Sequence, residues 1–179
     1  MCTTFIFEPG QNRKIAALRI PECVCFFYVS RETLMEVSMS VYMERALELA
    51  KTALINDEVP VGAVIVQNNT VISEAYNQKE QKNNSLLHAE MIAISKACDF
   101  KKSWYLDDCT LYTTMEPCMM CCGAILQSRI KKIVYLLKNE KYGCTHLLEN
   151  SKIEIIKEEK DEEIRNIIQT FFKNKRKND

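Results

Sequence analysis

No stretch of this 179-residue sequence approaches the roughly 20 consecutive apolar residues that a membrane-spanning helix needs. A signal peptide is also missing, because the early apolar run from Cys23 to Val29 is short and leads into Ser-Arg-Glu without a small-residue cleavage site. Net charge is zero, with 24 basic and 24 acidic residues, so any nucleic acid would have to be bound by local patches. We therefore expect a cytoplasmic protein with no membrane association.

Histidine is scarce, with two residues, whereas nine cysteines make a high count. In a secreted chain that count would suggest a disulfide framework. Because a reduced cytosolic protein is expected here, most cysteines are interpreted as small buried apolar residues, and a close cysteine pair favours metal binding.

The patterning of the chain changes near residue 38. Residues 1–38 show no sustained helical or alternating period, and Met35, Met39 and Met43 stand immediately before the first well-patterned helix. We interpret this segment as an N-terminal extension that is either disordered or the product of a mis-assigned start. Residues 39–179 are long enough for one domain with a full hydrophobic core.

Strands and helices alternate in the pattern of residues 39–179. Helical periodicity begins at Ser40, and two apolar segments on either side of Asn68-Asn69 predict a β-hairpin. The later predicted elements are a helix from His88, a strand at 111–114, a helix at 118–128, strands at 133–137 and 153–156, and a closing helix at about 158–175. This alternation predicts an α/β fold, a three-layer α/β/α sandwich with a five-stranded mixed sheet whose later strands run parallel through helical crossovers.

Two short motifs carry the chemistry: His88-Ala89-Glu90 and Pro117-Cys118-Met119-Met120-Cys121. Thiolates at i and i+3 lie on one helical turn, so Cys118 and Cys121 can bind a single ion, and His88 offers a third ligand. Three protein ligands leave a tetrahedral zinc ion one open position, which is typical of a catalytic site. Glu90 is close enough in sequence to move protons to and from a bound water without binding metal.

Other interpretations of these residues have to be weighed. A lone C-x-x-C is often a structural zinc knuckle or a redox pair, but no second pair completes a four-ligand site here, and the other histidine, His146, is interpreted as a surface or packing residue. Cys122 is also a helical neighbour of Cys118, and spacing alone leaves it open against Cys121.

With these motifs in place, residues 39–176 resemble the cytidine and deoxycytidylate deaminase superfamily, and within it the bacterial tRNA adenosine deaminases. The stretches that carry the resemblance are Glu58 to Val64, Tyr76-Asn77, His88 to Glu90, Glu116 to Cys121, Ser128 to Ile130, and Asp161 to Phe172. The sequence departs from many bacterial relatives at Asn139 to Gly143, in a loop that lies near the nucleic acid in that family.

The resemblance implies hydrolytic conversion of adenosine to inosine at the wobble position (34) of a tRNA anticodon, typically of an arginine tRNA. It further implies one zinc ion per subunit, a homodimer, Glu90 as the proton shuttle, and Cys121 as the ligand rather than Cys122. Substrate contacts are implied at Asn77, Val61, Ala89 and Phe172, although each of these positions also has a purely structural interpretation. Two alternatives stay open: a deaminase of a free base or nucleoside such as guanine, cytosine or cytidine, and a non-catalytic, zinc-stabilised RNA-binding module.

Overall fold

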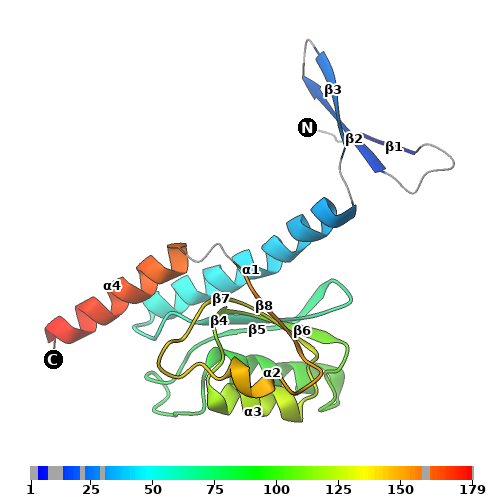
Figure 1. Cartoon of the computed structure of the whole chain (residues 1–179). Coiled ribbons are helices and arrows are strands. Elements are labelled where there is room, and N and C mark those ends of the chain that lie inside the picture. Colours follow the sequence, from blue (N-terminus) through cyan, green and yellow to red (C-terminus); the bar gives the residue numbers. More distant parts are fainter. Residues whose placement is uncertain (1–3, 8–13, 21–22, 29–30, 159–161, 179) are drawn as a thin grey trace. The chain divides into compact units, whose positions relative to one another are not determined.

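The computed structural model describes residues 4–7, 14–20, 23–28, 31–158 and 162–178, and by its internal contacts the chain divides into two compact units, Met1–Val41 and Tyr42–Asp179 (Figure 1). The described part of the first unit contains β1 (Thr4–Phe7), β2 (Lys14–Ile20) and β3 (Cys23–Tyr28), which form an antiparallel sheet in that order. The sequence pattern alone did not predict these strands.

Helix α1 (Arg31–Ile55) begins before the predicted start at Ser40. Residues 31–39 contain neither Gly nor Pro and include Leu, Met, Glu and Arg, all of which are good helix formers. Backbone propensity therefore carries the helix beyond the part that has a clear amphipathic pattern.

The second unit contains the predicted five-stranded mixed sheet, and its strand order is β5-β4-β6-β7-β8. Its strands are β4 (Gly62–Gln67), β5 (Thr70–Tyr76), β6 (Cys109–Met115), β7 (Lys132–Leu137) and β8 (Glu154–Lys157). Strand β4 pairs antiparallel with both β5 and β6, whereas β6, β7 and β8 run parallel. The predicted hairpin between β4 and β5 is confirmed, and Asn68 and Asn69 at its turn have φ angles of 49° and 61°, the left-handed region that a type I′ turn requires.

Helices cover both faces of this sheet (Figure 1). Helices α2 (Ala89–Lys101) and α3 (Met119–Gln127) lie on one face, and residues 42–55 of α1 together with α4 (Glu162–Asn178) lie on the other, which confirms the three-layer sandwich. The core includes Ile65, Leu111, Ile125 and Ile133, all fully buried, where apolar side chains of the sheet meet α3 and α2.

The two parallel connections are built differently. Helix α3 connects β6 to β7, as predicted, but the connection from β7 to β8 contains only a short 3-10 helix, η1 (Thr145–Leu148). Within this second connection, Gly143 pairs with Cys118 in a β-bridge and the Cys144 N–H donates to the Pro117 carbonyl oxygen at 3.1 Å, so this part of the loop is held against the start of α3. No helix in the described ranges is both long and apolar enough to cross a lipid bilayer.

Candidate metal centre and active site

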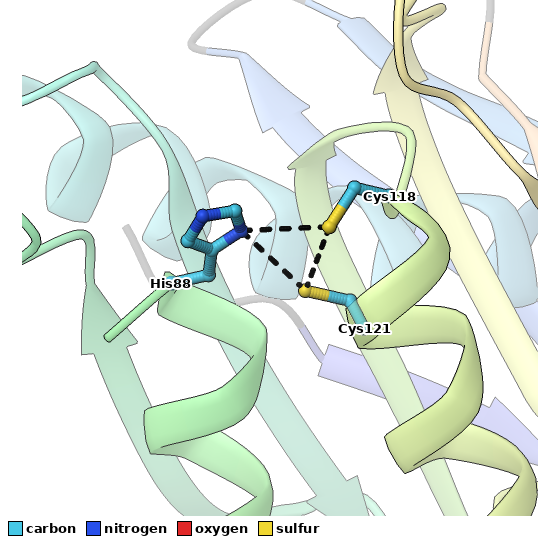
Figure 2. A group of neighbouring side chains, drawn as sticks. All are labelled: His88, Cys118 and Cys121. Carbon is cyan, nitrogen blue, oxygen red and sulfur yellow. Dashed lines mark hydrogen bonds between the residues drawn. The ribbon is translucent and has the colours of Figure 1, made fainter. Parts of the chain in front are cut away.

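The N-termini of helices α2 and α3 lie close together and supply the three candidate ligand residues. His88 is the N-cap of α2, Cys118 is the N-cap of α3, and Cys121 lies in the first turn of α3. Figure 2 shows the three side chains pointing toward one another from these two helices. The distances are 3.6 Å between His88 Nδ1 and Cys118 Sγ, 3.6 Å between the two sulfurs, and 3.7 Å between Cys121 Sγ and His88 Nδ1.

This triangle fits a tetrahedral metal ion. Zinc bonds of about 2.3 Å to sulfur and about 2.0 Å to nitrogen, at the tetrahedral angle, place two sulfurs ~3.8 Å apart and sulfur and nitrogen ~3.6 Å apart. All three measured distances lie close to these values. Within the described part of the chain, His88, Cys118 and Cys121 form the one group of three or more such side chains that could hold a metal ion.

Cys122 does not belong to this triangle. Its side chain is 2% exposed and lies in the hydrophobic core, with Sγ 3.6 Å from the carbonyl oxygen of Pro117. Burial raises the pKa of this thiol to about 12, and its sulfur contacts the Pro117 carbonyl oxygen instead of His88 or Cys118. The position of His88 therefore identifies Cys121, and not Cys122, as the ligand. Sequence spacing within the helix does not give that position.

The electrostatics of the ligand group favour a thiolate. Hydrogen bonding from Cys121, together with His88, holds the pKa of Cys118 at about 4, and the Cys118 hydrogen bond raises the pKa of His88. The pKa of Cys121 is raised, first by its hydrogen bond with Cys118 and next by burial. The two sulfurs thus share one proton, and a divalent cation that displaces this proton would convert both sulfurs to thiolates.

Glu90 is the second residue of α2, and its side chain is 4% exposed. Burial raises the pKa of its carboxyl group above the ordinary range, and the carboxyl is close enough to Cys121 to accept a hydrogen bond from it. A carboxyl whose pKa is shifted upward can take up and release a proton near neutral pH. A buried carboxyl group with a raised pKa therefore lies beside the ligand group.

The predicted substrate residues fall into two groups. Ala89 is fully buried between His88 and Glu90, and Val61 and Asn77 meet at the end of the hairpin, where the Asn77 backbone N–H donates to the Val61 carbonyl oxygen at 3.1 Å. Phe172 is not among the contacts of this cluster: it lies on α4, is 45% exposed, and lines a depression formed by α4 residues. His146 is exposed on η1, which confirms its assignment as a surface residue.

Glu116 and Gly143, to which the sequence analysis gave no role of their own, hold the altered loop. Glu116 is 5% exposed and accepts hydrogen bonds from the backbone N–H groups of Asn139 and Thr145, at 3.2 Å each, and from the Thr145 hydroxyl. Gly143 pairs with Cys118 in a β-bridge, and a Cβ atom there would collide with the Glu116 carboxylate. The loop is therefore fixed directly against a ligand residue.

An α/β/α sandwich that carries a three-ligand His/Cys/Cys group with a buried glutamate beside it defines a deaminase of the cytidine deaminase-like class. The sequence comparison agrees, since residues 37–176 match the profile of the MafB19-like deaminases. The chain belongs to this family.

Particular relatives narrow the comparison. The chain is 39% identical over 145 residues to the tRNA-specific adenosine deaminase of Bacillus subtilis (strain 168), an alignment that covers 76% of this chain and 90% of the relative. It is similar to a solved structure from a study of A-to-I editing by tRNA:A34 deaminases, with a TM-score of 0.68, 31% identity, and coverage of 72% of this chain and 99% of that one. A guanine deaminase from Bacillus subtilis is also similar, with a TM-score of 0.54, 30% identity, and coverage of 75% and 93%. The predicted resemblance to the tRNA adenosine deaminases is thereby confirmed.

Proposed function

We propose that this protein hydrolyses the 6-amino group of adenosine at the wobble position (34) of a tRNA anticodon, which yields inosine and ammonia. The observation that carries the proposal is the His88, Cys118 and Cys121 triangle beside the buried Glu90, in a chain 39% identical to a tRNA-specific adenosine deaminase over 90% of that relative. The proposal includes a cytoplasmic location, where tRNA is found and cysteines stay reduced; the six cysteines whose side chains are described are all free thiols.

Zinc is the metal that the donor set fits best, since one imidazole nitrogen and two thiolates are typical zinc ligands. We propose one zinc ion per subunit, held by His88, Cys118 and Cys121. A bound zinc ion supplies a Lewis acid that activates the attacking water near neutral pH. Glu90 accepts a proton from that water, donates it to N1 of the adenine while water oxygen adds at C6, and transfers the second proton to the departing ammonia.

The remaining substrate contacts are proposed from the geometry of each side chain. Asn77 offers a polar amide to the flipped nucleotide, and Val61 and Ala89 form the apolar wall beside it. The exposed ring of Phe172 is available for stacking on a neighbouring anticodon base, which contributes about 1–3 kcal/mol per base in single-stranded nucleic acid recognition. The substrate is an anticodon stem-loop, and an arginine tRNA is the proposed source.

A homodimer is part of the proposal. Met119 and Leu126 lie two turns apart on one side of α3 and are 67% and 44% exposed, so α3 presents an apolar surface that a second copy of the chain could cover. Light scattering of the wild type should give the mass of two chains, and Leu126→Lys should give the mass of one. A wild-type mass of one chain at micromolar concentration contradicts the dimer.

The decisive experiment compares substrates of different size. Purified protein should convert adenosine to inosine in an anticodon stem-loop, detected as an A-to-G change in cDNA, and should leave free guanine, cytosine and cytidine unchanged. The similarity to guanine deaminase makes free guanine the most informative competitor. Activity on free guanine without activity on the stem-loop would assign the protein to the nucleobase deaminases.

A second experiment separates catalysis from RNA binding. Glu90→Gln should retain zinc and stem-loop binding but lose about 10²- to 10⁴-fold in rate, because the proton shuttle is gone. The exposed Glu149→Gln is the matched control and should keep full activity. If Glu90→Gln deaminates as fast as wild type, the protein is better described as a zinc-stabilised RNA-binding module.

A further inference from the structure

Glu58 is a fully buried carboxylate in the turn between α1 and β4. Its Oε2 atom accepts hydrogen bonds from Asn77 Nδ2 at 3.0 Å and from the Glu80 backbone N–H at 3.1 Å, and its Oε1 atom accepts from the Gln81 backbone N–H at 2.7 Å. All three donors are neutral. Burying a carboxylate costs free energy unless hydrogen bonds replace the lost water. Here three donors supply those bonds, so moving any one of them away from Glu58 is unfavourable.

The first consequence concerns the orientation of the Asn77 amide. A carboxylate only accepts hydrogen bonds, so the amide nitrogen of Asn77, and not its oxygen, must face Glu58. The main chain of Asn77 is held separately by the hydrogen bond to the Val61 carbonyl oxygen. The main chain and the amide nitrogen of Asn77 are thus both held in place. Its side-chain oxygen Oδ1 faces away from Glu58 and can accept a hydrogen bond from another partner.

The second consequence concerns the loop that leads into His88. Glu80 and Gln81 belong to residues 78–87, a segment closed at its ends by the hydrogen bond from the Gln78 N–H to the Leu87 carbonyl oxygen at 3.0 Å. Residues 79–86 are exposed, so the segment has little packing of its own to hold it. Glu58 thus links Asn77 and this loop to the body of the fold through one side chain.

We propose that Glu58 is a positioning residue for the nucleotide: its buried carboxylate fixes Asn77 so that Oδ1 accepts a hydrogen bond from an O–H or N–H group of the flipped nucleotide. This inference rests on the proposed function, because it assigns the polar contact of the same substrate site. It predicts that a group which only accepts hydrogen bonds can replace the Asn77 amide, provided that the side chain at position 58 donates to it.

A double-mutant cycle tests the proposal. Asn77→Asp alone places two carboxylates at hydrogen-bond distance, so it should lower the melting temperature and raise KM for the stem-loop about tenfold or more, with zinc content unchanged. Glu58→Gln added to Asn77→Asp lets the glutamine nitrogen donate to the new aspartate, which restores the hydrogen bond with the opposite polarity. Because the same glutamine nitrogen also faces the Glu80 N–H, which loses its acceptor, the double variant should recover the melting temperature only as far as that of Glu58→Gln alone and reach a KM within about threefold of that variant.

Glu116→Gln is the matched control, because Glu116 is another buried carboxylate that accepts from loop donors but contacts residues 139–145 instead. Its effects should add to those of Asn77→Asp without coupling. Additive effects of Glu58→Gln and Asn77→Asp would overturn the proposal. Recovery of the melting temperature without recovery of KM would also overturn it, since the nucleotide would then need the Asn77 N–H rather than Oδ1.

The two readouts separate this inference from the proposed function. Coupling in the melting temperature is measured without substrate, so it would survive if the wild type failed to deaminate the stem-loop. Activity on the stem-loop by the wild type, with no coupling between positions 58 and 77, would leave the proposed function standing and remove the role of Glu58.

Discussion

The adjacent pair Cys121 and Cys122 offers a test in which the same substitution has opposite consequences. Cys121 Sγ lies 3.6 Å from Cys118 Sγ and 3.7 Å from His88 Nδ1, whereas Cys122 Sγ contacts the Pro117 carbonyl oxygen from within the core. Cys121→Ser removes one of three thiolate or imidazole ligands and should lower the zinc content from about one per chain to near zero. Cys122→Ser should leave the zinc content unchanged.

The magnitude of the effect on stability follows from linkage. A zinc ion present at 1,000 times its dissociation constant stabilises the folded state by about 4 kcal/mol, and this contribution disappears on chelation. Wild type and Cys122→Ser should therefore both lose stability when a chelator is added, whereas Cys121→Ser should unfold at the same denaturant concentration with or without it. Cys122→Ser should itself cost about 1–3 kcal/mol, because a hydroxyl replaces an apolar thiol in the core.

The assay combines metal analysis by mass spectrometry with urea unfolding followed by circular dichroism, each with and without chelator. Zinc retained in Cys121→Ser and lost in Cys122→Ser would refute the geometric assignment of the ligands. Zinc retained in both variants would refute the three-ligand site.

Two further predictions concern residues around the site and the stability of the fold. Gly143→Ala should cost about 1–3 kcal/mol of unfolding free energy and lower stem-loop activity, because the new Cβ collides with the Glu116 carboxylate. Urea unfolding and an activity assay measure the two effects. A variant as stable and as active as wild type would contradict the close approach of Gly143 to Glu116. Lys101, with Gln67, holds the pKa of Asp108 at about 2, below its ordinary value, so the charged carboxylate stabilises the folded state above about pH 4 and loses this effect as the pH falls towards 2. Because the Asp108 side chain is 46% exposed, Asp108→Asn should lower the free energy of unfolding by no more than about 1 kcal/mol at pH 7. In urea titrations, the difference from wild type should shrink below pH 4. Asp107→Asn is the control.

The sequence was sufficient for the residues whose chemistry is local. The His88-Ala89-Glu90 and Pro117 to Cys121 motifs predicted the ligand group, and the Asn68-Asn69 turn predicted a hairpin, because each depends on a few neighbouring residues. The alternation of apolar segments predicted the mixed sheet for the same reason.

The residues that the sequence did not identify depend on long-range contacts. Glu58 and Glu116 look like ordinary loop acids, and their burial follows only when backbone N–H groups from distant loops converge on them. Cys121 and Cys122 are both helical neighbours of Cys118, at i+3 and i+4, so the choice between them depends on the position of His88. The short 3-10 helix between β7 and β8 was not predicted either, and the loop before it is held by backbone hydrogen bonds to the distant Glu116.

The position of His88 and Cys118 as N-caps has an effect that no single side chain produces. Neither cap makes a side-chain hydrogen bond to its own helix, and because both caps belong to the ligand group, the positive ends of two helix dipoles lie beside it. A field of this sign favours negative charge at the ligand group. Small anions should therefore inhibit this protein in competition with water, and their affinity should depend on the fold more than on any neighbouring lysine or arginine.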